Sequence, residues 1–289
     1  MVFKYDLHNH SNRSFDCGVD GKELISLAKN RGVKGIGICD HDNFPNQSLE
    51  EQAKAEGIDV VLGIEFSCID AHIIGYNLQL RKRDKDYLKQ KFKDFYRAHT
   101  EHGRSLISQL KEKKWDIDEI DIMSFSGKPF VTAIDIFRYF ADVKKLYSRW
   151  QETRRDFRQK KMFSLTKKEV DHFDPYEIIQ LIKRSNGVAV WAHPLFSRTN
   201  NHKYFNSFEP EDVFIEVSYP YLENGIEYGT SNEELQKIVK DRCIEKGFRM
   251  SGGSDSHYPI KVFNSGVPIF PGDFGLDKED EPIIQQLFC

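Results

Sequence analysis

Hydrophobic and polar positions along the first eighty residues predict short buried strands separated by amphipathic helices. The strands are expected at 3–8, 35–39, 59–64 and 71–76, and the helices at 22–30 and 48–56. Gly32 follows the first helix as a stop signal, and Ser48 and Glu51 open the second with the spacing of a capping box. This part of the chain is therefore predicted to be an α/β unit.

The pattern changes at about residue 80, where charged helical stretches replace the strands. A long helix is expected over 86–114, followed by a loop at 124–129. Alternation then resumes, with strands predicted at 187–192, 213–217 and 248–252 and helices at 174–184 and 232–245. We predict that 1–80 and 171–289 form one domain and that 81–170 form a mainly helical insertion. Seven strands separated mostly by helices favour parallel pairing, in a barrel or a doubly wound sheet.

Charge is distributed unevenly along the chain, although the net charge is only −3. Residues 81–170 hold 24 Lys and Arg against 14 Asp and Glu, which leaves 18 basic and 31 acidic residues elsewhere. A basic segment of this kind is compatible with a solvated helical surface. It is equally compatible with a basic lid over a site for an anionic substrate.

Composition excludes several classes of protein. Hydrophobic residues make up 39% of the 289 residues and aromatic residues 13%, which is enough for a sizeable core and excludes global disorder. The longest apolar runs are too short to span a bilayer, and the N-terminal residues lack the pattern of a signal peptide. The 5 cysteines are scattered and show no CxxC spacing. We therefore expect a reduced, cytoplasmic protein.

Side chains that bind metal ions recur at the ends of the predicted strands. They are His8, His10, His41, Glu65, His72, His193, Asp255 and His257. All but His72 follow the C-terminal end of a strand, and in an α/β barrel these ends form the face that carries active sites. One HxH or Asp-His pair would be weak, because surface and core histidines are commoner than ligands, but the repetition predicts a metal site. The other histidines, His99, His102, His172 and His202, lack this placement and are expected to be ordinary surface residues.

The same residues, read in order, form motifs that resemble those of the PHP family, named for polymerase and histidinol phosphatase. The motifs are Asp6–Ser11, Asp40–Asp42, Gly63–Ser67, His72–Tyr76, Ala192–Pro194 and Gly253–His257. They lie on both sides of the insertion. The resemblance implies a distorted seven-stranded (β/α) barrel with a cluster of two or three divalent ions, of manganese, zinc or iron.

The family's ligand roles transfer to this chain residue by residue. The resemblance assigns one ion to His8, His10, Glu65 and Asp255, a second to Glu65, His72 and His193, and a third to Asp16, His41 and His257. Asp16 lies in Ser14–Gly18, where many relatives carry Ser-Asp-Gly, so a turn residue before Gly18 is the alternative for Asp16.

A metal cluster of this kind is suited to the hydrolysis of phosphate esters. It would clamp the phosphoryl oxygens and convert a bridging water to hydroxide. Glu65, Asp255 and His257 are the expected catalytic residues, and the proton donor to the leaving group stays open between Asp255, His257 and a water. The loop residues Arg13, Lys128 and Arg198 are candidate contacts to the substrate.

The insertion resembles one PHP subgroup, which includes nucleoside 3′,5′-bisphosphate phosphatases and exonucleases that trim short RNA from the 5′ end. Gly127–Phe130 and Asp174–Glu177 fit that layout, although the detailed sequence of the insertion departs from it. The expected substrate is therefore a small phosphorylated molecule, a nucleotide or short oligonucleotide. No protein partner is implied, and the protein is expected to be a monomer or small homo-oligomer.

Three other readings remain open at this point. The first is a phosphatase of the histidinol-phosphate or cyclic-phosphate type. The second is an amidohydrolase-type enzyme, which also uses a strand-end HxH pair but often bridges its metals with a modified lysine instead of a glutamate. The third is a non-catalytic module that binds metal or, through the basic insertion, nucleic acid.

Overall fold

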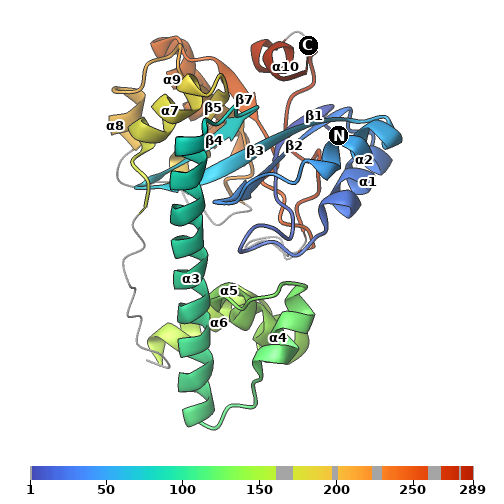
Figure 1. Ribbon diagram of the computed structural model, residues 1–289, viewed down its shortest axis with the longest axis vertical. Coiled ribbons are helices and arrows are strands. Elements are labelled where there is room, and N and C mark those ends of the chain that lie inside the picture. Colours follow the sequence, from blue (N-terminus) through green and yellow to red (C-terminus); the bar gives the residue numbers. More distant parts are fainter. Residues whose placement is uncertain are drawn as a thin grey trace.

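Seven strands form one sheet whose spatial order follows the sequence (Figure 1). The computed structural model describes residues 2–160, 172–196, 201–222, 230–259, 268–279 and 281–288. The strands are β1 (Tyr5–Asn9), β2 (Gly35–His41), β3 (Asp59–Cys68), β4 (Ala71–Tyr76), β5 (Val188–Ala192), β6 (Phe214–Ser218) and β7 (Met250–Gly252). All seven predicted strands are present, with ends that differ by a few residues.

One strand runs against the others, which corrects the predicted parallel pairing. β4 pairs antiparallel with β3 and with β5, whereas the remaining neighbours pair parallel. β3 extends to Cys68, beyond its predicted end at Ile64, so only Ile69 and Asp70 separate it from β4. Two residues suffice for a hairpin, whereas a parallel crossover needs a dozen or more.

The sheet curves round until its two edges meet. The chain after β7 bridges to β1, where the His10 amide donates to the carbonyl of Ser256 at 3.0 Å. Further along, Tyr5 and Leu276 exchange backbone hydrogen bonds of 2.9 and 2.8 Å. The seven strands therefore form a nearly closed barrel, as the sequence predicts.

Helices cover the outside of the barrel. They are α1 (Gly21–Arg31), α2 (Ser48–Glu56), α7 (Pro175–Arg184), η2 (Pro194–Phe196), α8 (Asn201–Phe205), α9 (Asn232–Lys246) and α10 (Pro282–Phe288). Sequence signals define several of their ends: Asp20 caps α1, and Gly32 ends it in the left-handed region at φ 88°. Asp174 accepts from the amides of Tyr176 and Glu177 and so caps α7.

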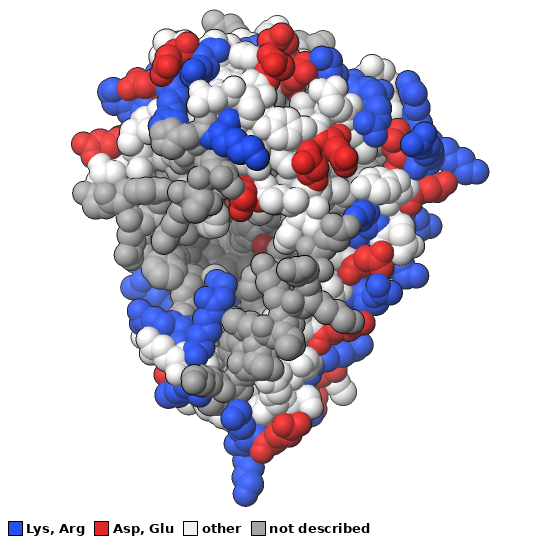
Figure 2. All heavy atoms as spheres, turned by 90° about the vertical axis from the view of Figure 1, so that its left-hand side faces the viewer, with Lys and Arg blue, Asp and Glu red and all other residues white. Residues whose placement is uncertain are grey.

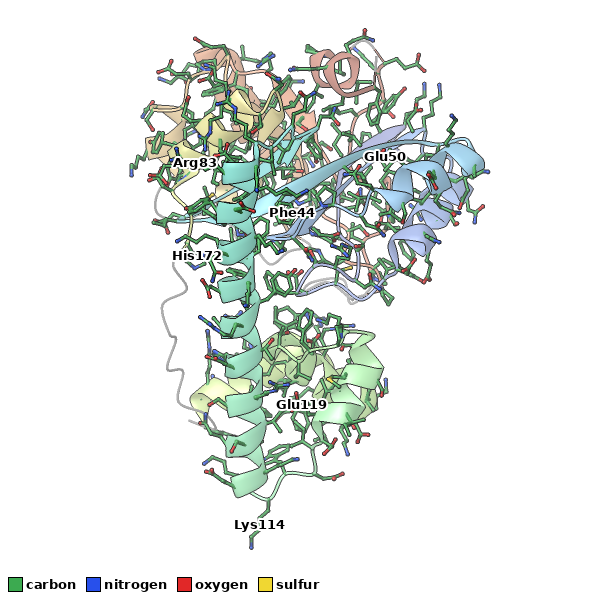
Figure 3. All side chains as sticks on the ribbon, viewed as in Figure 1. Phe44, Glu50, Arg83, Lys114, Glu119 and His172 are labelled. Atoms are coloured by element: carbon green, nitrogen blue, oxygen red, sulfur yellow. The ribbon has the colours of Figure 1, made fainter. Side chains whose placement is uncertain are left out.

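The described part of the chain between β4 and β5 consists of helices joined by loops. It forms α3 (Lys82–Glu112), α4 (Glu119–Ser126), α5 (Ala133–Arg138), the π-helix η1 (Tyr139–Val143) and α6 (Trp150–Gln159) before α7. α3 leads away from the barrel to a separate group of helices (Figure 1), and Figure 3 shows Arg83 beside the barrel and Lys114 at the far end. With 31 residues, α3 is about 46 Å long.

These helices enclose a hydrophobic core of their own. It includes Leu106 and Leu110 of α3 and Phe157 of α6, whereas Leu88 and Phe92 of α3 pack into the core beside the barrel. One helix therefore contributes to both cores. Gly103 lies where α3 crosses the chain before α5, and a Cβ there would come within 2.3 Å of the Val131 carbonyl oxygen.

Two further expectations can be compared with the described residues. Cys17, Cys39, Cys68 and Cys243 are buried and free. Among the same residues, no helix combines the length and the apolar character needed to cross a bilayer.

Candidate metal centre

Polar side chains line one end of the barrel interior, and apolar side chains fill the rest. On β3, strand alternation puts Glu65 on the same face as the core residue Val61, and on β4 it puts His72 on the same face as Ile74. Because β4 is antiparallel to β3, its beginning lies beside the end of β3, where Ser67 pairs with His72. The direction of β4 thus explains how a residue near the start of a strand reaches the same edge as the others.

Glu65 lies at the centre of this end of the barrel and is fully buried. Five histidine rings surround its carboxylate. Oε1 lies 2.9 Å from His72 Nδ1 and 3.1 Å from His193 Nε2, and Oε2 lies 3.1 Å from both His8 Nε2 and His10 Nε2 and 3.4 Å from His41 Nε2. Burial alone would raise the pKa of Glu65, but His41, His8 and His72 hold it well below its usual range.

Asp255 joins the first two histidines from the opposite edge of the sheet. Its Oδ1 lies 3.1 Å from His10 Nε2 and 3.3 Å from His8 Nε2. Its Oδ2 accepts a hydrogen bond of 2.7 Å from the hydroxyl of Tyr219. The ligand atoms of His8, His10, Glu65 and Asp255 all lie within 4.8 Å of one another, so these four side chains could share one ion.

A second set of side chains lies on the other side of His10. The ligand atoms of His10, His41 and His257 lie within 4.8 Å of one another. Asp16 faces this set, with 3.6 Å from its Oδ2 to His41 Nε2 and 3.3 Å from its Oδ1 to His257 Nε2. Burial would raise the pKa of Asp16, but His257 and His41 hold it far below its usual range.

Backbone irregularities help to aim these side chains. The pairing of β1 with β2 shifts register between Asp6 and Asn9, where three steps along β1 match two along β2. Such a bulge redirects side chains. Here two successive residues both face the barrel interior, because Leu7 packs in its core and His8 joins the cluster at its end. His193 and Asp255 adopt positive φ values of 33° and 49° where the chain leaves β5 and β7. Conformations of this kind cost about 1–3 kcal/mol each and concentrate at functional sites.

The donor set fits divalent metal ions. With metal–ligand bonds of about 2.0–2.2 Å, neighbouring ligand atoms lie about 3.0–3.6 Å apart, as the nitrogens of His8 and His10 do at 3.2 Å. Nearby positive charge is also needed to stabilise the buried carboxylates in their ionised form. Burial lowers the pKa of His10, but hydrogen bonds and attraction from Asp255 and Glu65 raise it to about 10. Imidazole and carboxylate together suit zinc, manganese and iron.

Residues behind the cluster orient its histidines, and the sequence analysis missed them. Glu216 Oε1 lies 3.0 Å from His8 Nδ1, and its Oε2 accepts from the His193 amide at 2.8 Å. The hydroxyl of Ser14 lies 2.9 Å from His10 Nδ1. Partners of this kind turn the other ring nitrogen toward a metal. A signal for Glu216 was present, because a lone carboxylate interrupts the otherwise apolar run Phe214–Val217.

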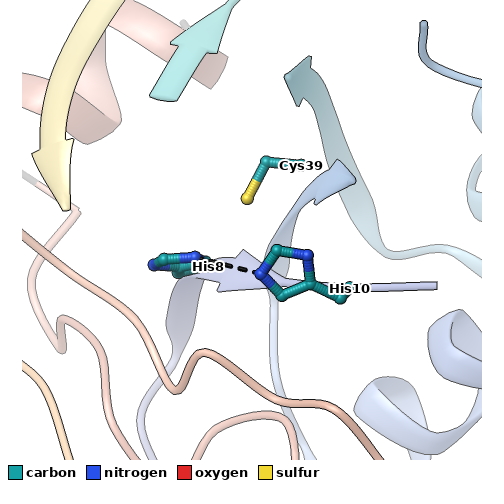
Figure 4. Close-up of side chains that lie close together, drawn as sticks. All are labelled: His8, His10 and Cys39. Carbon is teal, nitrogen blue, oxygen red and sulfur yellow. Dashed lines mark hydrogen bonds between the residues drawn. The ribbon is translucent and has the colours of Figure 1, made fainter. Parts of the chain in front are cut away.

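Cys39 of β2 lies next to the first two histidines, as Figure 4 shows. Its sulfur and ring nitrogens of His8 and His10 lie within 4.8 Å of one another. The thiol donates to the Asn9 carbonyl at 3.8 Å, and burial raises its pKa well above the usual range for cysteine. The sequence places Cys39 only in a buried strand, and in the structure its side chain packs in the hydrophobic core of the barrel with Leu7 and Val61.

The predicted substrate contacts have varied surroundings. Arg13 Nη2 donates to Asn43 Oδ1 at 3.3 Å and to the Phe44 carbonyl at 3.0 Å. The ammonium of Lys128 is buried and lies 2.6 Å from Asp135 Oδ1. Arg13 Nη2 and the Lys128 ammonium therefore have partners within the protein, whereas Arg13 Nε has no hydrogen-bond partner among the described residues. Arg198 lies outside the described residues.

The prediction of ordinary surface histidines is wrong for His99. Its ring stacks on Phe15 with centroids 4.5 Å apart and also contacts Phe95. Burial lowers the pKa of His99 to about 4. His102 and His172 are partly buried as well. Helical periodicity on a charged segment could not reveal that α3 turns His99 toward a loop near the metal cluster.

A nearly closed α/β barrel with imidazoles and carboxylates gathered at one end is the architecture of a metal-dependent hydrolase. The sequence model for the PHP domain matches residues 6–188, well over half of the chain, and the chain therefore belongs to the PHP domain family. Membership of this family supports the assignment of the chain as a metal-dependent phosphoesterase. His193, Asp255 and His257 lie beyond the matched residues, yet the fold brings them to the same cluster.

Solved structures with the same fold carry names from two kinds of hydrolase. One, provisionally named a metal-dependent phosphoesterase and from Bifidobacterium adolescentis, has a TM-score of 0.71 at 18% identity, with 100% of this chain and 96% of that one covered. The other, an amidohydrolase from Chromobacterium violaceum with bound sulfate and no metal, has a TM-score of 0.69 at 23% identity, with 98% and 95% covered. No curated protein matches the chain by sequence. At these identities the likeness concerns the fold alone.

Proposed function

We propose that the protein is a metal-dependent phosphoesterase that hydrolyses small anionic substrates, with 3′,5′-bisphosphate nucleotides or short RNA as the substrate class. The observation that carries the proposal is the convergence of five imidazoles on the buried carboxylate of Glu65. Membership of the PHP family supports the phosphoesterase activity. The nucleotide class rests on the sequence of the insertion.

Three groups of residues would hold the ions. His8, His10, Glu65 and Asp255 form the first group, Glu65 with His72 and His193 the second, and Asp16, His41 and His257 the third. Glu65 belongs to two of them because its two oxygens face different histidines. Divalent ions at these positions supply positive charge to the phosphoryl oxygens and acidity to a water nucleophile.

The chain's own residues hold this arrangement in place. Glu216 orients His8, and the Tyr219 hydroxyl fixes one oxygen of Asp255 so that the other faces His8 and His10. Burial would raise the pKa of Asp255, but His8 and His257 hold it well below its usual range. We assign to Asp255 the role of an ionised ligand, and we keep His257 as the candidate for positioning the proton that the leaving group receives.

A phosphate ester suits this site better than an amide does. A phosphate ester carries negative charge, so its hydrolysis needs several positive groups around the phosphoryl oxygens. Divalent ions held by the three ligand groups would supply this positive charge. The residue that faces the five histidines at the centre is Glu65, not a lysine. The amidohydrolase reading therefore remains only as an outcome of the test.

Fewer basic side chains of the segment 81–170 are available to attract an anionic substrate than its composition implies. Figure 2 shows one face on which basic side chains extend to the lower tip with acidic side chains among them. Several are paired within the segment, including Arg104 with Glu119 at 2.8 Å and Lys144 with Asp116 at 2.6 Å. Exposed pairs of this kind contribute about 0–1 kcal/mol. We propose that the remaining positive charge favours anionic leaving groups.

The decisive experiment is a substrate screen with the manganese-loaded protein. Mononucleotides, 3′,5′-bisphosphates, cyclic phosphates, short RNA, histidinol phosphate and a panel of amides would be compared by release of product. Glu65→Gln, purified in the same way, controls for contaminating phosphatases. Hydrolysis of phosphate esters, fastest with nucleotides and absent in the variant, is expected. Cleavage of amides alone, or metal binding without any hydrolysis, would contradict the proposal.

A further inference from the structure

Asp16 is carried by a loop, residues 11–18, which we call the ligand loop. On its barrel side the loop is fastened to β2 and the turn after it. The hydroxyl of Ser11 donates to Asp40 Oδ2 at 2.8 Å, and the amide of His41 donates to the Ser14 hydroxyl at 2.8 Å. These contacts fix the beginning of the loop. They do not reach Asp16 itself.

The helical segment between β4 and β5 contacts the other side of the ligand loop. The hydroxyl of Tyr96, on α3, lies 2.6 Å from the carbonyl oxygen of Arg13 and 2.9 Å from that of His41. One hydroxyl therefore joins the ligand loop to the end of β2 at His41, a member of the third ligand group. The backbones also approach closely, because a Cβ on Gly18 would lie 3.2 Å from the Ser126 carbonyl oxygen.

Lys128 makes the second connection. Its ammonium donates to the Phe15 carbonyl at 2.6 Å, and that carbonyl belongs to the peptide bond that leads into Asp16. The side chain is fully buried and pairs with Asp135 at 2.6 Å. A buried ammonium that already has these partners is placed to hold the loop, not to receive a phosphate from solvent.

The ring of Phe15 adds a third contact between the two parts. It lies between His99 of α3, stacked at 4.5 Å, and His41, at 5.0 Å. The ring that packs against a candidate metal ligand is thus supported from behind by the helical segment.

We propose that Tyr96 and Lys128 are positioning residues that hold Asp16 against His41 and His257, so that the helical segment completes the third metal site. This inference rests on the proposed function, because it assumes that the third ligand group binds an ion. It gives the segment a role in assembling the centre, in addition to any attraction for anionic substrates.

The test compares manganese binding by matched variants of the whole protein. Tyr96→Phe removes one hydroxyl, and Lys128→Met removes one ammonium. Tyr147→Phe and Lys144→Met are the controls, because the Tyr147 hydroxyl bonds to Asp156 and Lys144 pairs with Asp116, away from the ligand loop. Asp16→Asn serves as the reference for loss of the third site. Binding is followed by titration with Mn²⁺, together with kcat and KM for one phosphate ester.

Tyr96→Phe and Lys128→Met are expected to weaken the ion that Asp16→Asn also weakens, by about tenfold or more, the range found when a supporting partner of a metal ligand is lost. Excess Mn²⁺ should restore kcat in Tyr96→Phe, with KM little changed. The controls should bind as the wild type does. If Lys128→Met does not fold, Lys128→Met with Asp135→Asn removes both charges of the pair, and Tyr96→Phe decides independently.

The possible failures are distinguishable. Manganese binding by Tyr96→Phe and the lysine variant equal to that of the wild type would overturn the positioning role and leave the phosphoesterase proposal intact. A loss of stability that Mn²⁺ does not reverse, with unchanged affinity, would also overturn it. A wild-type protein that binds no Mn²⁺ would overturn both proposals.

Discussion

Two groups of buried charged residues lie on either side of the ligand loop, and they differ in how their charge is balanced. In the metal centre, the buried carboxylate of Glu65 and the largely buried carboxylate of Asp255 face several imidazoles, whose charge depends on protonation. In the helical segment, the carboxylate of Asp135 faces the ammonium of Lys128, and its other oxygen accepts from the amide and hydroxyl of Thr132.

The metal centre needs positive charge from a bound ion, whereas the Asp135–Lys128 pair balances its own charge. Asp135 has a permanent cation from the chain itself and also caps α5, so its burial is balanced once the protein folds. The histidines of the metal centre instead direct ring nitrogens to common points, and the other ring nitrogens of His8 and His10 contact Glu216 and Ser14. Four predictions follow from this distinction, in order of decreasing effect.

Asp135→Asn should produce the largest loss of stability. It leaves the buried ammonium of Lys128 without a counterion, and breaking such a pair costs about 3–5 kcal/mol. Urea unfolding would measure the change. Added Mn²⁺ should not reverse the lost pair interaction, since Asp135 lies outside the metal centre. Stability within about 1 kcal/mol of the wild type would show that this pair contributes little.

Glu65→Gln should instead affect activity more than folding. Removing the charge at the centre weakens two ligand groups together. Turnover should fall about 10²–10³-fold, because the ions that these groups would hold are what stabilises transition-state charge. Steady-state kinetics and metal analysis would be compared with thermal unfolding of the same samples. Near-normal turnover with unchanged metal content would exclude the bridging role of Glu65.

Removal of the ions should lower stability by an intermediate amount. A ligand at a hundred times its Kd stabilises the folded state by about 2.7 kcal/mol, so EDTA should lower the unfolding temperature and abolish activity. If neither EDTA nor Mn²⁺ changed the unfolding temperature, the buried carboxylates would need no bound ion for stability.

Glu216→Gln should have the smallest effect of the four. The amide keeps the shape of the side chain but can accept only one of the two hydrogen bonds, from His8 or from His193. Loss of such a supporting partner lowers metal affinity about 10–100-fold. A Mn²⁺ titration at constant ionic strength would reveal it. Affinity equal to that of the wild type would mean that packing alone orients these histidines.

Much of the barrel could be predicted because its signals are local. Strand positions follow from apolar runs, and ends of helices follow from Asp20, Asp174 and Gly32, which act through their own backbone neighbourhood. The metal cluster could be predicted from strand ends, since these converge in any barrel. The direction of β4 was missed because β3 was predicted to end at Ile64, so the two-residue hairpin that joins β3 to β4 was not recognised.

The remaining parts of the site depend on contacts between distant segments. Glu216 lies 208 positions from the histidine that it orients, and Lys128 lies 113 positions from the carbonyl that it holds. No periodicity in the sequence encodes such pairs. A lysine next to Gly127 and Pro129 in a basic segment reads equally well as a phosphate contact or as a buried support, and only the fold shows that its ammonium is enclosed.

The unbroken length of α3 constrains how this chain can vary. Each residue of a helix advances the axis by about 1.5 Å and rotates it by about 100°. A single insertion between Phe92 and Gly103 would therefore rotate the core of the helical segment relative to the barrel. It would also separate Val131 from Gly103, which allows the close approach of the two backbones. Insertions and deletions should be tolerated at the Lys113–Lys114 turn, where the helix has ended, and rejected between the two cores.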